Sequence, residues 1–133
     1  MGVTSGKSTG KGPAPIDLST IEELADGDGA ALNELIAMFK RHTIQAIARA
    51  RLAIRAGQLR DAAQIAHTCI GFTATLGLTT MVPILRQLEQ TARAQQLEKP
   101  RLKELTRVVQ EWEREFARVE SVLQARINRF SAP

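Results

Sequence analysis

Apolar positions along this chain recur at steps of three and four residues, the spacing that gathers side chains on one face of an α-helix. Gly27, Gly57 and Gly77 interrupt the pattern, and glycine commonly follows the last residue of a helix. No segment has the pattern of a β-strand. Five helices are therefore predicted, a short one over 19–25 and four long ones that begin near Asp28, Gln58, Thr80 and Pro100.

Local start signals accompany three of these helices. Ser19 and Glu22 have the spacing of a capping box, in which each side chain accepts a hydrogen bond from a backbone N–H. Asp28 is a favourable N-cap for the second helix. Thr80 is the predicted N-cap of the fourth, and Pro83 is tolerated in its first turn because first-turn N–H groups have no helical partner.

The last predicted helix has the longest apolar seam, which extends over roughly 42 Å at 1.5 Å per residue. Such a face must be buried against neighbouring helices. The same spacing is typical of coiled coils, so a dimer seam is the alternative interpretation. The seam consists of Leu102, Leu105, Val109, Trp112, Phe116, Val119, Leu123, Ile127 and Phe130.

Four long amphipathic helices with short connections predict an all-α fold, an antiparallel up-down-up-down four-helix bundle whose short N-terminal helix covers one end. The bundle domain should comprise residues 16–130. Residues 1–15 contain almost no apolar side chains, so burial cannot offset the entropy cost of ordering them, and we predict a disordered tail.

Composition and charge exclude several function classes. The chain has 133 residues, 44% hydrophobic and 24% charged, as is usual for one globular domain. Of its net charge of +4, Lys7 and Lys11 in the tail contribute two. Arginine alternates with glutamate on the helices and aromatic residues are only 4%, which argues against nucleic-acid binding.

The single cysteine, Cys69, allows no intramolecular disulfide, which favours a reducing, cytoplasmic location. No apolar run approaches the 18 to 20 or so residues of a membrane span. The two histidines share no helix face, so neither a metal nor another cofactor is expected. His42 is predicted to be a surface or boundary residue.

The third helix carries the candidate chemistry. A helical wheel places Ile65, Cys69, Phe72 and Leu76 toward the core and His67 nearly opposite to them. A neutral imidazole near pH 7 is a good nucleophile toward phosphorus. An exposed histidine is also a common surface residue, and this alternative stays open. The residues predicted to surround His67 are Arg60, Ala63, Gln64, Gly71 and Ala74 on its face and Ile70 on its flank.

The segment Ala66-His67-Thr68-Cys69-Ile70-Gly71, followed by Leu76-Gly77 and Leu88-Glu89, resembles the histidine-containing phosphotransfer (HPt) domain family. The similarity covers about residues 16–123. It implies a monomeric bundle in which His67 accepts a phosphoryl group from the aspartate of a receiver domain, including that of a hybrid sensor histidine kinase. The phosphoryl group then passes to a second receiver.

The resemblance further implies a signalling carrier that is not an enzyme, with Gly71 keeping the acceptor uncrowded and Mg²⁺ held only by the receiver. The docking surface would comprise the residues around His67. The family motif has lysine at the position of Ile70, so phosphate stabilisation is predicted to come from Arg60, Arg86 or Arg93. The alternative is a degenerate HPt-like module that binds a receiver or another signalling protein without efficient transfer.

Overall fold

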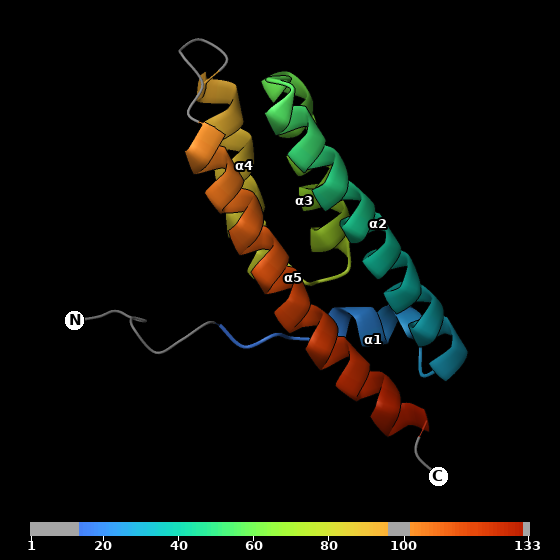
Figure 1. Cartoon of the computed structure of the whole chain (residues 1–133). Helices are drawn as coiled ribbons and strands as arrows, with labels where there is room; N and C mark the ends of the chain where they lie inside the picture. The colour runs from blue at the N-terminus through green and yellow to red at the C-terminus, as the bar shows by residue number, and fades with distance from the viewer. Residues whose placement is uncertain (1–13, 96–101, 132–133) are drawn as a thin grey trace, which may run out of the picture.

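A computed structural model describes residues 14–95 and 102–131 (Figure 1). Within these residues the chain forms helices and no strand, which confirms the all-α prediction. None of the helices described is long and apolar enough to cross a membrane. The elements are α1 (Ser19–Ala25), α2 (Gly29–Arg55), α3 (Leu59–Thr75), the 3₁₀ turn η2 (Thr79–Met81), α4 (Val82–Gln95) and α5 (Leu102–Ser131).

The four long helices form the predicted antiparallel bundle (Figure 1). Each packs on the next along the chain, and α5 returns to pack on α2, so the bundle closes as a ring. The short helix α1 lies across one end and packs on α2, while the C-terminal part of α5 continues past it. Most of the predicted tail, 1–15, and the predicted start of the last helix at Pro100 lie outside the described residues.

The helix starts confirm one predicted cap and correct two. Asp28 is the N-cap of α2, because its Oδ1 accepts hydrogen bonds from the backbone N–H groups of Ala30 and Ala31. The capping box at Ser19 is wrong: α1 has no side-chain cap at its N-cap residue, and Asp17 accepts the Ser19 N–H at 2.9 Å. Thr80 does not cap α4, since it lies inside the 3₁₀ turn and its hydroxyl is buried without a partner.

Three predicted helix ends have a left-handed glycine, Gly27 with φ of 75°, Gly57 with φ of 73° and Gly77 with φ of 76°. Their surroundings differ. A Cβ added at Gly57 would meet nothing within 4 Å, whereas one at Gly77 would lie 2.6 Å from Oγ1 of Thr20 in α1. Gly77 therefore ends α3 and also leaves room for the short helix that covers this end of the bundle.

The apolar seam of α5 is turned into the bundle. Its side chains from Leu105 to Leu123 are buried, and Trp112, at 1% exposure, is among the largest of them. Leu102 corrects the predicted seam, because it stands at the first described residue of α5 and is 42% exposed. Ile127 is only half-buried, where α5 extends past the other helices.

Candidate functional site

One side of α3 is buried and the other forms an exposed ridge. The exposed ridge comprises Arg60, Gln64, His67, Gly71 and Ala74. The core side is centred on Ala62, Ala66 and Thr73, none more than 2% exposed. The His67 side chain lies on the flank that faces α4 and is 64% exposed. His67 therefore stands at the surface, as predicted, but beside α4 rather than opposite the core.

One detail of the predicted wheel is wrong. Ala63 was placed on the outer face, yet it is fully buried in a helix that packs on both α2 and α4. Cys69 and Phe72, predicted on the core side, do pack against the core but are half-buried, at the edge that faces α2. Small residues pack where helices approach closely, and hydrophobicity alone does not mark them as core.

A carboxylate from α4 holds one nitrogen of the His67 ring. Glu89 Oε2 lies 3.1 Å from His67 Nδ1, and the Glu89 side chain is only 17% exposed. The same oxygen accepts hydrogen bonds from Arg93 Nε at 3.0 Å and from Arg93 Nη2 at 2.8 Å. The site is thus a chain of three side chains, in which Glu89 links a cation to the imidazole.

This geometry assigns the proton on the neutral ring. A carboxylate accepts hydrogen bonds and does not donate them, so the Nδ1 beside Glu89 carries the hydrogen. Nε2 then has a free lone pair, and it has no hydrogen-bond partner among the described residues. The ring can act as a nucleophile through Nε2 while Nδ1 stays fixed.

The other predicted neighbours on α3 leave the approach to His67 open. Arg60, Gln64, Gly71 and Ala74 are exposed, whereas Ile70 is half-buried against the core. A Cβ added at Gly71 would meet nothing within 4 Å, so packing among the described residues does not require glycine there. The space above Gly71, one helical turn from His67, is available to a partner.

Of the three predicted cations, the structure brings one to the site. Arg93 reaches it through Glu89. Arg60 and Arg86 are exposed and form no ion pair with another residue of the described ranges. Position 70, half-buried and apolar, supplies no charge.

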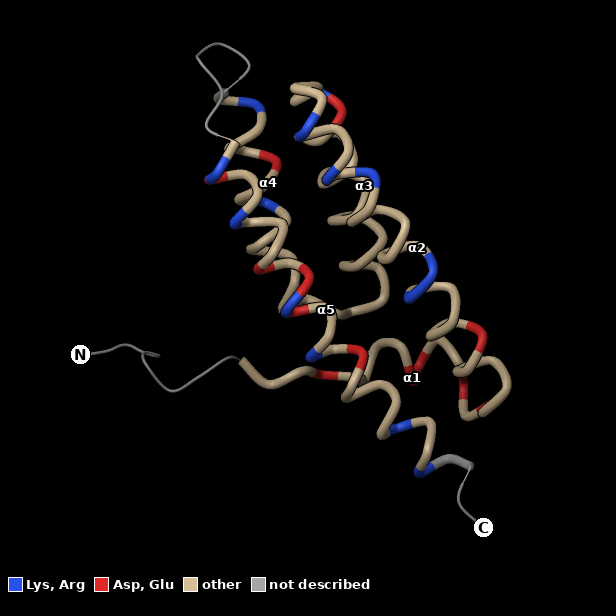
Figure 2. The backbone as a smooth tube through the Cα atoms, in the orientation of Figure 1, with Lys and Arg blue, Asp and Glu red and all other residues tan. Residues whose placement is uncertain are grey.

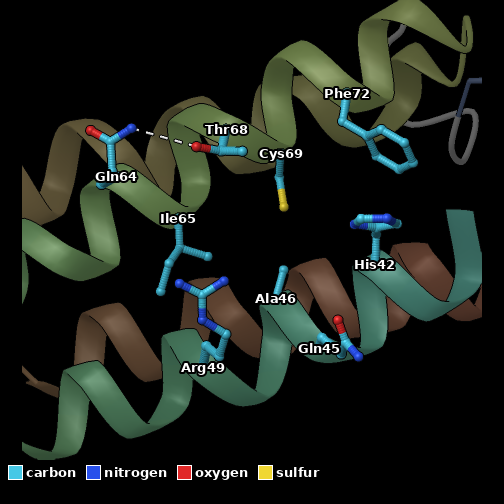
Figure 3. Close-up of a pocket in the computed structure, with 9 residues that line it drawn as sticks. All are labelled: His42, Gln45, Ala46, Arg49, Gln64, Ile65, Thr68, Cys69 and Phe72. Atoms are coloured by element: carbon cyan, nitrogen blue, oxygen red, sulfur yellow. Dashed lines mark hydrogen bonds between the residues drawn. The ribbon is translucent and has the colours of Figure 1, made fainter.

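A groove of about 140 Å³ runs between α2 and α3 beside the exposed ridge (Figure 3). Ile65 and the Cys69 thiol lie at its floor, and burial raises the pKa of that thiol to about 11, against the effect of the Arg49 cation. Phe72 meets the ring of His42 at one end, with 5.1 Å between centroids, and His42 is exposed as predicted. A thiol that remains protonated is not a competing nucleophile.

No group of three or more His, Cys, Asp or Glu side chains within residues 14–95 and 102–131 is arranged to hold a metal ion. In the sequence, Glu113 and the glutamates near it resemble a carboxylate cluster. In the structure Glu113 pairs with Arg51 instead, and this pairing lowers the pKa of the Glu113 carboxyl. The chemistry available here is that of His67 and Glu89.

The sequence model of the Hpt domain matches residues 34–126, well over half of the chain. The chain belongs to the Hpt domain family. No curated protein and no solved structure matches it. Hpt domains are phosphocarriers that work with receiver domains in phosphorelays, and they are not enzymes with substrates of their own. His67 lies on the exposed ridge of α3 within the matched residues.

One residue of this Hpt domain's site was missed by the sequence analysis. Glu89 entered only as part of a familiar Leu88-Glu89 pair, with no role of its own. Its position next to Leu88, on the edge of the apolar stripe of α4, was the available signal, because a carboxylate there lies at a helix interface rather than in open solvent. Glu89 faces His67 because α3 packs on α4, and no local sequence pattern specifies that packing.

Proposed function

We propose that this Hpt domain is a phosphocarrier in a multistep two-component phosphorelay. His67 accepts a phosphoryl group from the aspartate of one receiver domain, either free or part of a hybrid sensor histidine kinase, and passes it to the aspartate of another. The observation that carries this proposal is the exposed imidazole whose Nδ1 is held by Glu89 at 3.1 Å, which leaves Nε2 free. The single cysteine, which allows no intramolecular disulfide, supports a cytoplasmic location for the exchange.

In the transfer step, the lone pair of Nε2 attacks the phosphorus of the aspartyl phosphate. An N–P bond forms as the P–O bond to the aspartate breaks, and the carboxylate leaves with the bonding electron pair. The proton stays on Nδ1, where the Glu89 carboxylate stabilises the positive charge that develops on the ring. Mg²⁺ and the acidic cluster belong to the receiver, and the Hpt domain contributes no cofactor. The reverse sequence delivers the phosphoryl group to the second receiver.

Arg93 is the proposed phosphate-stabilising cation. It shares Glu89 Oε2 with the imidazole, so its guanidinium stands next to the ring that carries the phosphoryl group. Its side chain is 50% exposed, which leaves it able to turn toward an incoming anion. Arg60 and Arg86 would contribute more weakly, as exposed charges screened by solvent.

A second function is favoured by one observation, the half-buried Ile70 at the position of the family lysine. Without that cation the chain could be a degenerate Hpt module that binds a receiver or another signalling protein and transfers little phosphate. The two functions differ in one measurable quantity, the label that His67 carries after mixing.

The test mixes the full chain with a panel of receiver domains labelled from radioactive acetyl phosphate. Label on the Hpt domain that is lost in acid, kept in base and absent from His67→Gln supports the carrier. Receiver binding without label supports the degenerate module. Ile70→Lys should then raise the transfer rate several-fold, because a nearby cation stabilises the transferred charge. An unchanged rate with binding intact would show that the missing lysine is not limiting.

A further inference from the structure

The groove between α2 and α3 is part of a longer depression. A second groove, of about 490 Å³, continues from it toward the α2–α3 loop, and both are lined by Arg49, Gln64 and Ile65. Gln64 donates to Thr68 Oγ1 at 3.4 Å along the α3 side, and Thr68 is the residue after His67. Figure 3 shows Arg49 rising from α2 toward α3 at the middle of this depression.

Arg49 is one of the basic side chains that the fold leaves unpaired. Lys40 and Arg51, on the opposite flank of α2, form ion pairs with Glu120 and Glu113 of α5. Arg49 is exposed and has no ion pair or hydrogen bond with another described residue. A cation without a partner beside an apolar floor is suited to an anionic group on another molecule.

The surrounding charge has the same sign. Figure 2 shows several basic positions along α2, with acidic positions near α1 and the start of α2. Arg41 and Arg60 are also exposed and unpaired within the described part of the chain. Asp61, at the far end of the second groove, is the one carboxylate among the residues that line either groove. An acidic partner is therefore favoured over a basic one.

We propose that Arg49 is a specificity-determining residue, which binds a carboxylate on the rim of the receiver's acidic active site while an apolar side chain of the receiver occupies the groove over Ile65 and Cys69. The inference rests on the proposed function and deepens it. It adds a contact on the α2 side of α3 to the phosphoryl contacts on the α4 side, where Arg93 pairs with Glu89.

A second copy of this chain is a poorer occupant of the groove. Two copies that met groove to groove about a twofold axis would bring Arg49 toward Arg49, and Asp61 at the far end is the one carboxylate that lines either groove. The receiver, whose acidic cluster must approach His67 for transfer, carries the complementary charge.

The test measures the initial rate of label transfer against receiver concentration for wild type, Arg49→Glu, Arg49→Lys and a matched control, Arg55→Glu. The control makes the same charge change on the same helix at an exposed residue that lines neither groove. Thermal unfolding checks that each variant is folded.

Arg49→Glu should raise the receiver concentration for half-maximal rate at least roughly 10-fold, with less than about a threefold change in the rate at saturation. Arg49→Lys should stay close to wild type, and Arg55→Glu should shift the half-maximal concentration by less than about threefold. If wild type is labelled but the two glutamate variants behave alike, the role of Arg49 is overturned and the proposed function stands. If no receiver labels wild type, the proposed function itself fails.

Discussion

The reactivity of His67 depends on one neighbouring side chain. Glu89 holds Nδ1 and so determines which nitrogen is free, while Arg93 keeps the carboxylate in place through two hydrogen bonds to the same oxygen. Both the Glu89 contact with His67 and the Arg93 contact with Glu89 form without burying the imidazole ring. A histidine that is 64% exposed is thus fixed in tautomer and orientation without being enclosed.

Replacing Glu89 by glutamine should lower the rate of transfer to His67 by roughly 10- to 100-fold, because the amide neither fixes the tautomer nor stabilises the developing imidazolium. Single-turnover transfer from a labelled receiver measures the rate. Glu111→Gln is the matched control, since it also removes an i,i+4 ion pair, with Arg107, from a helix surface. Equal rates for the two variants would contradict the role of Glu89.

Gly71 should matter more for receiver binding than for the stability of the domain. Its backbone has no positive φ and a Cβ there meets nothing, so Gly71→Ala is expected to stabilise the domain by about 1 kcal/mol through helix propensity. The same methyl group would project into the space that the receiver must occupy. Chemical denaturation should therefore show a gain in stability, while the receiver concentration for half-maximal transfer rises. A variant that gains stability and transfers normally would show that the space is not used.

At the level of the helices, the sequence predicted most boundaries because local chemistry determines them. Asp28 and the glycines at 57 and 77 act through the backbone of their own turn, and each ends or begins a helix where expected. The predictions failed at Ser19 and Thr80. At Ser19 the Asp17 carboxylate accepts the Ser19 N–H, and at Thr80 the chain forms a 3₁₀ turn.

The orientation of α3 was predicted less well. Cys69 and Phe72 are half-buried and line the groove toward α2, while the alanines Ala62, Ala63 and Ala66 are fully buried. Ala63 is buried in a helix that packs on both α2 and α4. Such placement depends on how closely two helices approach, which is a property of the pair and not of either sequence segment.

The packing of α1 against the α3–α4 connection can be tested at Gly77. Gly77→Ala should destabilise the fold by roughly 2 to 3 kcal/mol, since it adds a clash with Thr20 to the cost of a left-handed alanine. Gly57→Ala has the same backbone cost with open space around it, so about 1 kcal/mol is expected there. Urea unfolding compares the two. Equal losses would mean that α1 does not pack here in solution.

At the scale of the whole molecule, the bundle uses its longest apolar face internally. The seam side chains of α5 from Leu105 to Leu123 are buried against the other helices, so little of the predicted seam remains for a second chain. The large hydrophobic side chains that stay exposed among the described residues are scattered: Leu24, Ile44, Leu52 and Leu102.

The domain is therefore predicted to be a monomer of 14.6 kDa. Light scattering after size-exclusion chromatography, over a 100-fold range of loading concentration, should give this mass throughout. A mass that rises toward twice this value with concentration would revive the dimer interpretation of α5.

The central claim is that His67 takes the phosphoryl group on Nε2 because Glu89 occupies Nδ1. It is tested most directly by NMR of the ¹⁵N-histidine-labelled domain after phosphorylation by a receiver, in which coupling to ³¹P identifies the bonded nitrogen. The account predicts one phosphorylated histidine, His67, with the N–P bond at Nε2 and the proton still on Nδ1. Phosphate on Nδ1, or on His42, would contradict it.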